Sequence, residues 1–154
     1  MNKAQWYIRN DNGVQHLVYL NSKAKELDKL INKEKTMIIR GAAGKKSPLG
    51  GRAKVNDDIF FVETGGDLTV NYKGIITKVI ESDKMTSEES EKFIKQYEKE
   101  LNLTSEQYKR WNGKKYLAVY EISDLTKIEP FKYNRESNMD DWIITESIDD
   151  IKQG

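Results

Sequence analysis

A short apolar segment and the glycine-rich stretch after it hold a concentrated group of cations in this 154-residue sequence. The segment Lys35–Arg40 reads Lys-Thr-Met-Ile-Ile-Arg, and residues 41–52 follow as Gly-Ala-Ala-Gly-Lys-Lys-Ser-Pro-Leu-Gly-Gly-Arg. Arginine presents a planar fork of donors that suits phosphate or a base edge, and glycine lets backbone N–H groups approach an anion. The pattern therefore predicts a site for phosphate or a nucleotide, with contacts from Lys35, Arg40, Lys45, Lys46 and Arg52.

Simpler roles for these residues stay open. Arg40 also suits an ion pair with Asp57, Asp58 or Glu63. Residues 41–52 also suit an exposed polar loop. Only two residues separate Gly41 from Gly44, whereas the phosphate loop of nucleoside triphosphatases has four between its glycines. The sequence thus does not predict triphosphate hydrolysis.

Two tryptophans lie among charged residues, a setting that suits stacking on a nucleic-acid base. Trp111 follows Arg110, and Trp142 follows the acidic pair 140–141. Aromatic rings stack on unpaired bases, and a carboxylate accepts a hydrogen bond from a base amino group. Both tryptophans are therefore candidate ligand contacts. The alternatives are that Trp111 anchors a short helix in the core and that residues 138–142 form an acidic turn.

Composition excludes several kinds of chemistry. The chain has no cysteine and one histidine, His16, which rules out disulfides and thiolate ligands and argues against a histidine-based zinc site or a Ser-His-Asp triad. We therefore expect no metal and no cofactor. No apolar run is long enough to span a membrane and residues 1–6 have no apolar signal core, so we expect a cytoplasmic protein. The length predicts one domain over 1–154, with residues 1–13 and the acidic tail 145–154 peripheral.

Charge is distributed unevenly along the chain although its formal net value is only +1. Residues 1–56 carry twelve Lys and Arg against four Asp and Glu, and residues 57–154 carry fourteen against twenty-one. The first part is therefore net +8 and the second net −7. A locally basic surface on a nearly neutral protein favours a phosphate-bearing ligand over general adhesion to nucleic acid, unless folding mixes the two parts and cancels the field.

Helices and strands must position the residues of the candidate site, and the sequence predicts more strands than helices. Asn21 or Ser22 caps a predicted helix over 23–31, and capping boxes at Thr86 and Thr104 open two more. β-branched and aromatic runs predict strands at 16–20, 36–39, 59–62, 68–80 with a bulge near Gly74, 116–122, 128–133 and 142–144. This order predicts an α+β fold, a small and mostly antiparallel β-barrel with flanking helices.

These residues resemble the ASCH family, which has a PUA-like β-barrel and is generally thought to bind RNA. The family signature, Gly-x-Lys-x-x-Glu-x-Arg at a helix-to-strand junction, has its lysine at Lys35 and its arginine at Arg40. The later Gly-Asp is approximated by Asn56-Asp57, and the strand ending in Gly-x-apolar-x-x-Val is matched by residues 74–79. The resemblance covers roughly residues 17–123.

The chain departs from the family at two signature positions, with Lys33 in place of glycine and Ile38 in place of glutamate or threonine. Some small ASCH proteins are amidohydrolases that deacylate N4-acetylcytidine with a lysine, a threonine and a glutamate. The resemblance would give these roles to Lys35, Ile38 and Glu100. Since Ile38 has no hydroxyl, we expect a binding protein rather than an enzyme.

The leading interpretation is an RNA- or nucleotide-binding module with a basic cleft between the first helix, the Lys35–Arg40 strand and loop 41–52. One alternative is an amidohydrolase that acts on an N4-acylated or otherwise modified cytidine. The other is a protein-interaction module. The expected partner is RNA or a nucleotide or nucleoside, and the sequence does not define an oligomeric state.

Overall fold

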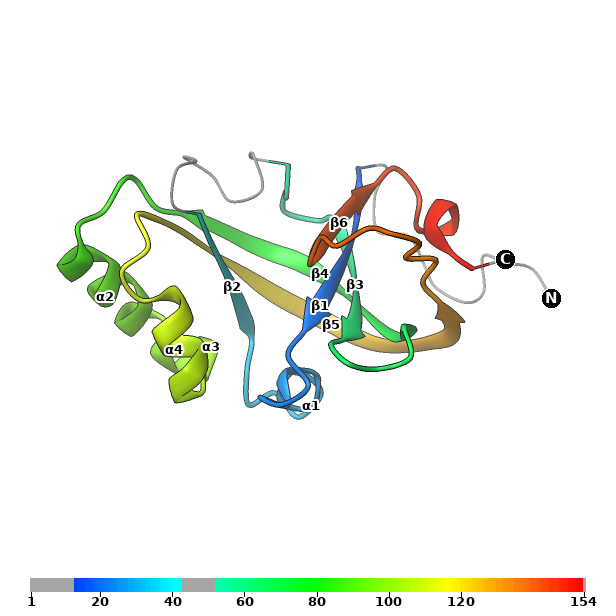
Figure 1. Cartoon of the computed structure of the whole chain (residues 1–154), viewed down its shortest axis with the longest axis horizontal. Coiled ribbons are helices and arrows are strands. Elements are labelled where there is room, and N and C mark those ends of the chain that lie inside the picture. The colour runs from blue at the N-terminus through cyan, green and yellow to red at the C-terminus, as the bar shows by residue number, and fades with distance from the viewer. Residues whose placement is uncertain (1–12, 43–51, 154) are drawn as a thin grey trace.

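The fold is built around one six-stranded sheet. The computed structural model describes residues 13–42 and 52–153, so Lys45 and Lys46 lie outside the described residues. Along these ranges the elements are β1 (Gln15–Leu20), α1 (Glu26–Ile31), β2 (Met37–Ala42), β3 (Asp58–Glu63), β4 (Thr69–Glu81), α2 (Ser87–Gln96), α3 (Glu98–Leu101), α4 (Ser105–Trp111), β5 (Tyr116–Lys132), β6 (Trp142–Thr145) and the 3-10 helix η2 (Ile148–Ile151) (Figure 1).

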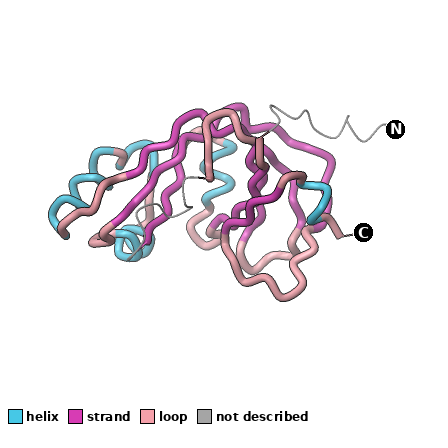
Figure 2. The backbone as a smooth tube through the Cα atoms, turned by 90° about the horizontal axis from the view of Figure 1, so that it is seen from above, coloured by secondary structure: helices cyan, strands magenta, loops and turns pink. Residues whose placement is uncertain are grey.

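The strands follow the order β2-β5-β4-β3-β1-β6, and only β1 and β3 pair in parallel. The sheet curves into an arch, as Figure 2 shows, and forms a half-barrel with β2 and β6 at its described edges. The predicted α+β, mostly antiparallel and PUA-like fold is confirmed, with an open sheet in place of a closed barrel over the described residues.

The longest strand, β5, corrects the prediction of two separate strands at 116–122 and 128–133. It runs unbroken through Pro130. β2 pairs with β5 only over residues 116–121 of β5. Pro130 lies beyond that region, where β2 does not pair with β5, so the N–H group that proline lacks is not needed for pairing with β2. The predicted bulge near Gly74 is confirmed by a register shift between Lys73 and Ile75. A side chain at Gly74 would meet Ile122 at 2.7 Å, so the close approach requires glycine.

The helices confirm both capping boxes and shorten the first predicted helix. Thr86 and Thr104 accept hydrogen bonds from the N–H groups of Glu89 and Gln107. The first helix begins at Glu26 and not at residue 23, because the preceding residues form turns and Lys25 has a left-handed φ of 55°. No helix in residues 13–42 and 52–153 is long and apolar enough to cross a membrane.

Buried side chains form clusters on the two faces of the β2–β5 part of the sheet. Alternation along β2 sends Ile38 toward α1 and Ile39 toward α2–α4. A further cluster lies over β1, β3 and β6 and includes Ile148, which is fully buried. The acidic tail is therefore held by the apolar face of η2, while Asp149 and Asp150 remain exposed.

Candidate functional site

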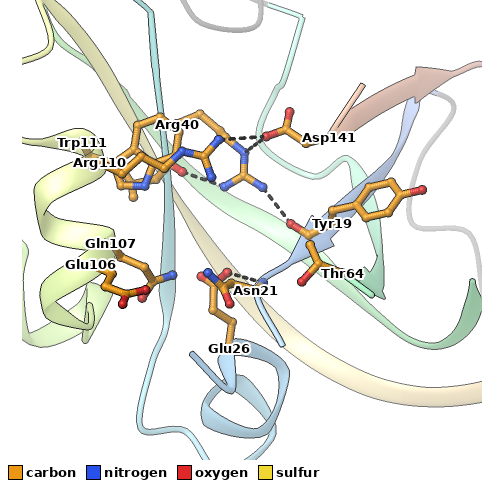
Figure 3. Close-up of a pocket in the computed structure, with 11 residues that line it drawn as sticks. Tyr19, Asn21, Glu26, Arg40, Thr64, Glu106, Gln107, Arg110, Trp111 and Asp141 are labelled. Atoms are coloured by element: carbon orange, nitrogen blue, oxygen red, sulfur yellow. Dashed lines mark hydrogen bonds and ion pairs between the residues drawn. The ribbon is translucent and has the colours of Figure 1, made fainter. Parts of the chain in front are cut away.

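A cavity of about 280 Å³ opens where the curled sheet brings β2 near the end of β1. Its walls come from elements that are far apart in the sequence: α1, α4, β2, and the residues that follow β1 and β3 (Figure 3). The lining residues are Tyr19, Asn21, Glu26, Ile39, Arg40, Thr64, Glu106, Gln107, Arg110, Trp111 and Asp141. The cavity shares the first helix and the Lys35–Arg40 strand with the predicted cleft and adds α4, whereas most of the predicted third wall, loop 41–52, lies outside the described residues.

Arg40 spans the gap between β2 and β1. Its Nη1 donates to the carbonyl oxygen of Ile39 at 2.7 Å, and its Nη2 donates to that of Tyr19 at 2.9 Å. Burial lowers the pKa of the Arg40 guanidinium, and the charge of Asp141 partly opposes this effect. The buried Nε–H has no hydrogen-bond acceptor. Arg40 is therefore held in place by the backbone while one of its donors stays unused.

Asp141 lies between two arginines at the rim of the cavity. Its Oδ2 is 3.5 Å from Arg40 Nε and 3.8 Å from Arg110 Nη2. The Asp141 side chain is 53% exposed and that of Arg110 is 62% exposed, so solvent reaches both. The Arg110 guanidinium also lies over the Trp111 ring, 4.4 Å from its centroid. This rim therefore combines two cations, one carboxylate and an aromatic wall.

Glu26 and Lys35 form a buried ion pair beside the cavity. Lys35 Nζ lies 3.4 Å from Glu26 Oε2 and also donates to the carbonyl oxygen of Leu101. Glu26 Oε1 accepts the backbone N–H of Asn21 at 2.7 Å. Burial lowers the pKa of Lys35 to about 8, although the Glu26 carboxylate favours the charged form. Glu26 lines the cavity and Lys35 does not, so Lys35 acts on the cavity through its partner.

Trp142 lies in the core and does not line the cavity. Its Nε1 donates to His16 Nδ1 at 2.9 Å, which leaves the His16 proton on Nε2, where it is donated to Asp57 Oδ2 at 2.8 Å. The Arg40 guanidinium lies 5.5 Å from the Trp142 ring centroid. Trp142 thus supports Arg40, whereas Trp111 lines the cavity although it is only 7% exposed.

The remaining predicted site residues lie away from the cavity or beyond the described ranges. Arg52 is exposed and does not line the cavity. Glu100 is half-buried, and its carbonyl oxygen accepts the N–H of Thr36. The carboxylate that forms an ion pair with Lys35 is that of Glu26, and Ile38 is fully buried in the core. Of the predicted set, Arg40 and Trp111 meet at one cavity, with Lys35 directly behind it.

Gly41 has a packing role rather than a loop role. Gly41 and Ala42 belong to β2, so the glycine-rich loop begins later than residue 41. A side chain at Gly41 would meet Leu117 at 2.9 Å and Trp111 at 3.0 Å. The absence of a side chain therefore lets α4 pack closely against β2 and bring Trp111 to the cavity.

Glu26 is a cavity residue that the sequence did not single out, although a signal was present. It precedes Leu30 by four positions and therefore shares the buried face of α1. An acidic residue on an apolar helix face needs a buried partner, which is Lys35.

In residues 13–42 and 52–153, no three His, Asp or Glu side chains converge as metal ligands.

The fold defines a small α+β protein of PUA-like architecture, and the cavity around Arg40 is its candidate site. No sequence-family model matches the chain, and no curated protein matches it. The structure is similar to that of the ASCH protein from Zymomonas mobilis, with a TM-score of 0.59 at 13% identity over 84% of this chain and 85% of the other. Two mutants of that protein, also at 13% identity, give TM-scores of 0.60 over 84% and 88% of this chain and 88% and 89% of theirs. The chain therefore has an ASCH-like fold, as the Lys35–Arg40 motif predicted.

Proposed function

We propose that the cavity binds one nucleoside or nucleotide, either free or as a unit of RNA. The observation that carries this proposal is the unused Nε–H of Arg40, held at the cavity by two backbone carbonyls. A buried donor without an acceptor costs free energy, and a ligand atom that accepts from it recovers that cost. A cavity of about 280 Å³ suits a single small ligand.

The charges of the lining favour a base or nucleoside over a long polyanion. Two arginines are accompanied by three carboxylates, those of Glu26, Glu106 and Asp141. Such a wall offers acceptors as well as donors, and base edges also present both. The apolar face of Trp111 adds a surface for a ring. The ASCH resemblance implies RNA as the source of that ligand.

Equilibrium binding tests the proposal. Titration calorimetry with the four ribonucleosides, their 5′-monophosphates and a short single-stranded RNA is expected to detect binding by the wild-type protein. Arg40→Met is expected to weaken it by roughly 10- to 100-fold, the range for a lost charged hydrogen bond. Lys109→Met is the control, because Lys109 is an exposed cation of α4 outside the cavity. If none of these ligands binds, the proposal is wrong.

Salt dependence separates one nucleotide from a long bound strand. A site that neutralises one phosphate gives a logarithmic salt slope of about −0.7, and a groove that neutralises several gives a multiple of that value. We expect the shallow slope for RNA. A steep slope would assign binding to the wider basic surface instead of the cavity.

A second candidate function is hydrolysis of N4-acetylcytidine to cytidine and acetate. The observation that favours it is the ion pair between Glu26, which lines the cavity, and Lys35 behind it. The Glu26 carboxylate is placed to accept a proton from water, and Lys35, whose pKa burial lowers to about 8, sets the charge beside it. The rate is then expected to rise with pH through about 8, as Lys35 loses its proton. Lys35→Met abolishes the reaction on this hypothesis. A wild-type protein that releases no acetate excludes it.

A further inference from the structure

Asp141 faces two cations that come from neighbouring elements of the cavity wall. Arg40 belongs to β2 and Arg110 to α4, and both face the same oxygen, Oδ2 (Figure 3). The distances of 3.5 and 3.8 Å exceed the usual range for an N–H···O hydrogen bond. The carboxylate is therefore close enough for charge attraction, but it does not hydrogen bond either guanidinium.

The unused donor belongs to Arg40, whose guanidinium is held by backbone hydrogen bonds. Both Nη atoms of Arg40 are fixed by backbone carbonyls, and its Nε–H lacks an acceptor although it is buried. Arg110 is exposed and rests on Trp111, so it is free to approach an anion. An oxygen placed between the two arginines would satisfy Arg40 and gain the charge of Arg110.

From this geometry, and on the basis of the proposed function, we propose that a ligand phosphate binds between Arg40 and Arg110 and displaces the Asp141 side chain. A phosphate carries more negative charge than a carboxylate and has three oxygens, enough to reach both guanidinium groups. The ligand class is then a phosphorylated nucleoside. Asp141 is a competitor built into the protein, and it disfavours anions that lack further contacts.

The backbone around Asp141 allows this exchange. The carbonyl oxygen of Asp141 accepts the N–H of Tyr19 at 2.9 Å, which ties the chain to β1. The side chain is half exposed, so it can rotate into solvent while the backbone stays bound. Displacement therefore requires a change of side-chain rotamer and leaves the sheet intact.

The test compares neighbouring aspartates. Asp141→Asn removes the competing charge at nearly constant shape, and Asp140→Asn is a matched control because Asp140 is exposed and does not line the cavity. Calorimetry with cytidine, adenosine, guanosine and uridine and with their 3′- and 5′-monophosphates measures the effect. For the nucleoside that binds, Asp141→Asn is expected to raise the ratio of monophosphate affinity to nucleoside affinity roughly two- to fivefold. Asp140→Asn is expected to leave this ratio unchanged.

Arg110→Gln gives the reverse comparison. It is expected to remove the preference for the monophosphate over the nucleoside while nucleoside binding persists. A nucleoside that binds with no gain from its phosphate, in both the wild type and Asp141→Asn, overturns this inference and leaves the proposed function standing. Absence of binding by every nucleoside and nucleotide overturns both.

Two further probes identify the source of the phosphate. Inorganic phosphate is expected to bind more weakly than the monophosphates, because it has no base contacts; equal affinity contradicts the inference. A dinucleotide has an internal phosphodiester. If the dinucleotide binds more tightly than either monophosphate, the bound phosphate belongs to an RNA strand. If a monophosphate binds more tightly than the dinucleotide, the site between the two arginines binds free nucleotides.

Discussion

Trp142 contacts two groups of buried polar side chains that differ in how their hydrogen bonds are satisfied. On one side, both ring nitrogens of His16 are bonded, to Asp57 and to Trp142 itself. On the other side, the Nε–H of Arg40 and the hydroxyl of Tyr120 have no hydrogen-bond partner. Arg40 lies over the Trp142 ring and Tyr120 packs 4.9 Å from it, so the two groups share one aromatic contact.

This difference separates structural from ligand-binding roles. A satisfied buried network stabilises the fold and has nothing left to offer a ligand. An unsatisfied buried donor costs stability and is retained where binding makes use of it. The His16 side therefore stabilises the packing of β1, β3 and β6, and the Arg40 side is the one on which the proposed ligand site depends.

The largest expected effect is on the satisfied side. His16→Leu keeps much of the side-chain volume but leaves Trp142 Nε1 without an acceptor and Asp57 without one of its donors. We expect a loss of about 3 kcal/mol in the free energy of unfolding, measured by urea denaturation. A loss below about 1 kcal/mol would show that the network does not stabilise the fold, because the loss of two buried hydrogen bonds is expected to cost more than that.

A smaller effect on the same side depends on pH. Burial lowers the pKa of His16 below its ordinary value of 6.5. The hydrogen bond to Asp57 and the charges of Asp57 and Asp58 oppose this shift, and the charge of Arg52 acts in the same direction as burial. Below pH 6.5, His16 therefore binds a proton in the unfolded chain more readily than in the folded chain. The His16 contribution to stability is complete above pH 6.5 and decreases as the pH falls toward the folded pKa.

The slope of this decrease is limited to about 1.4 kcal/mol per pH unit for one group. We expect the difference in unfolding free energy between the wild type and His16→Leu to shrink from pH 6.5 to 5.5, by at most about 1 kcal/mol. Chemical denaturation of both proteins at each pH cancels the titration of the other groups. A difference that grows on acidification would contradict the neutral His16 inferred from its hydrogen bonds.

The smallest expected effect is on the unsatisfied side. Tyr120→Phe removes a fully buried hydroxyl that has no hydrogen-bond partner, and burial raises the pKa of that hydroxyl far above its ordinary value. The free energy of unfolding is expected to stay within about 1 kcal/mol of the wild type or to rise. A clear loss of stability in thermal or urea unfolding would mean that the hydroxyl is bonded, and the contrast between the two sides would then disappear.

Local patterns in the sequence were sufficient for most of the fold. Strand periodicity located both ends of β1 and β3 and the start of β2 to within one residue, but it ended β2 three residues early. The capping boxes located α2 and α4. The sequence predicted two strands where β5 is one, because proline usually interrupts a strand. Only the strand pairing shows that β2 ends before Pro130 and that the proline is tolerated there.

The site was only partly predictable, because its members meet through tertiary contacts. Arg40 was recognisable from its place at the end of an apolar strand. The structural role of Trp142 could not be predicted, because the acceptor of its indole N–H, His16, is 126 residues away in the sequence. For the acidic pair before Trp142, the sequence does not say which member faces the cavity, and the fold selects Asp141 over Asp140. Side chains brought together from α1, α4 and β6 leave no common local pattern.

The pairing of β1 with β6 has a consequence for how the protein acquires its site during synthesis. β1 is translated first and lies between β3 and β6, so one of its two edges has no partner until residues 142–145 have emerged from the ribosome. The cavity also lacks Asp141 and the indole under Arg40 until then. A nascent chain that ends before β6 therefore has the arginine without its counter-charge and support, and the cavity is complete only when β6 has joined the sheet.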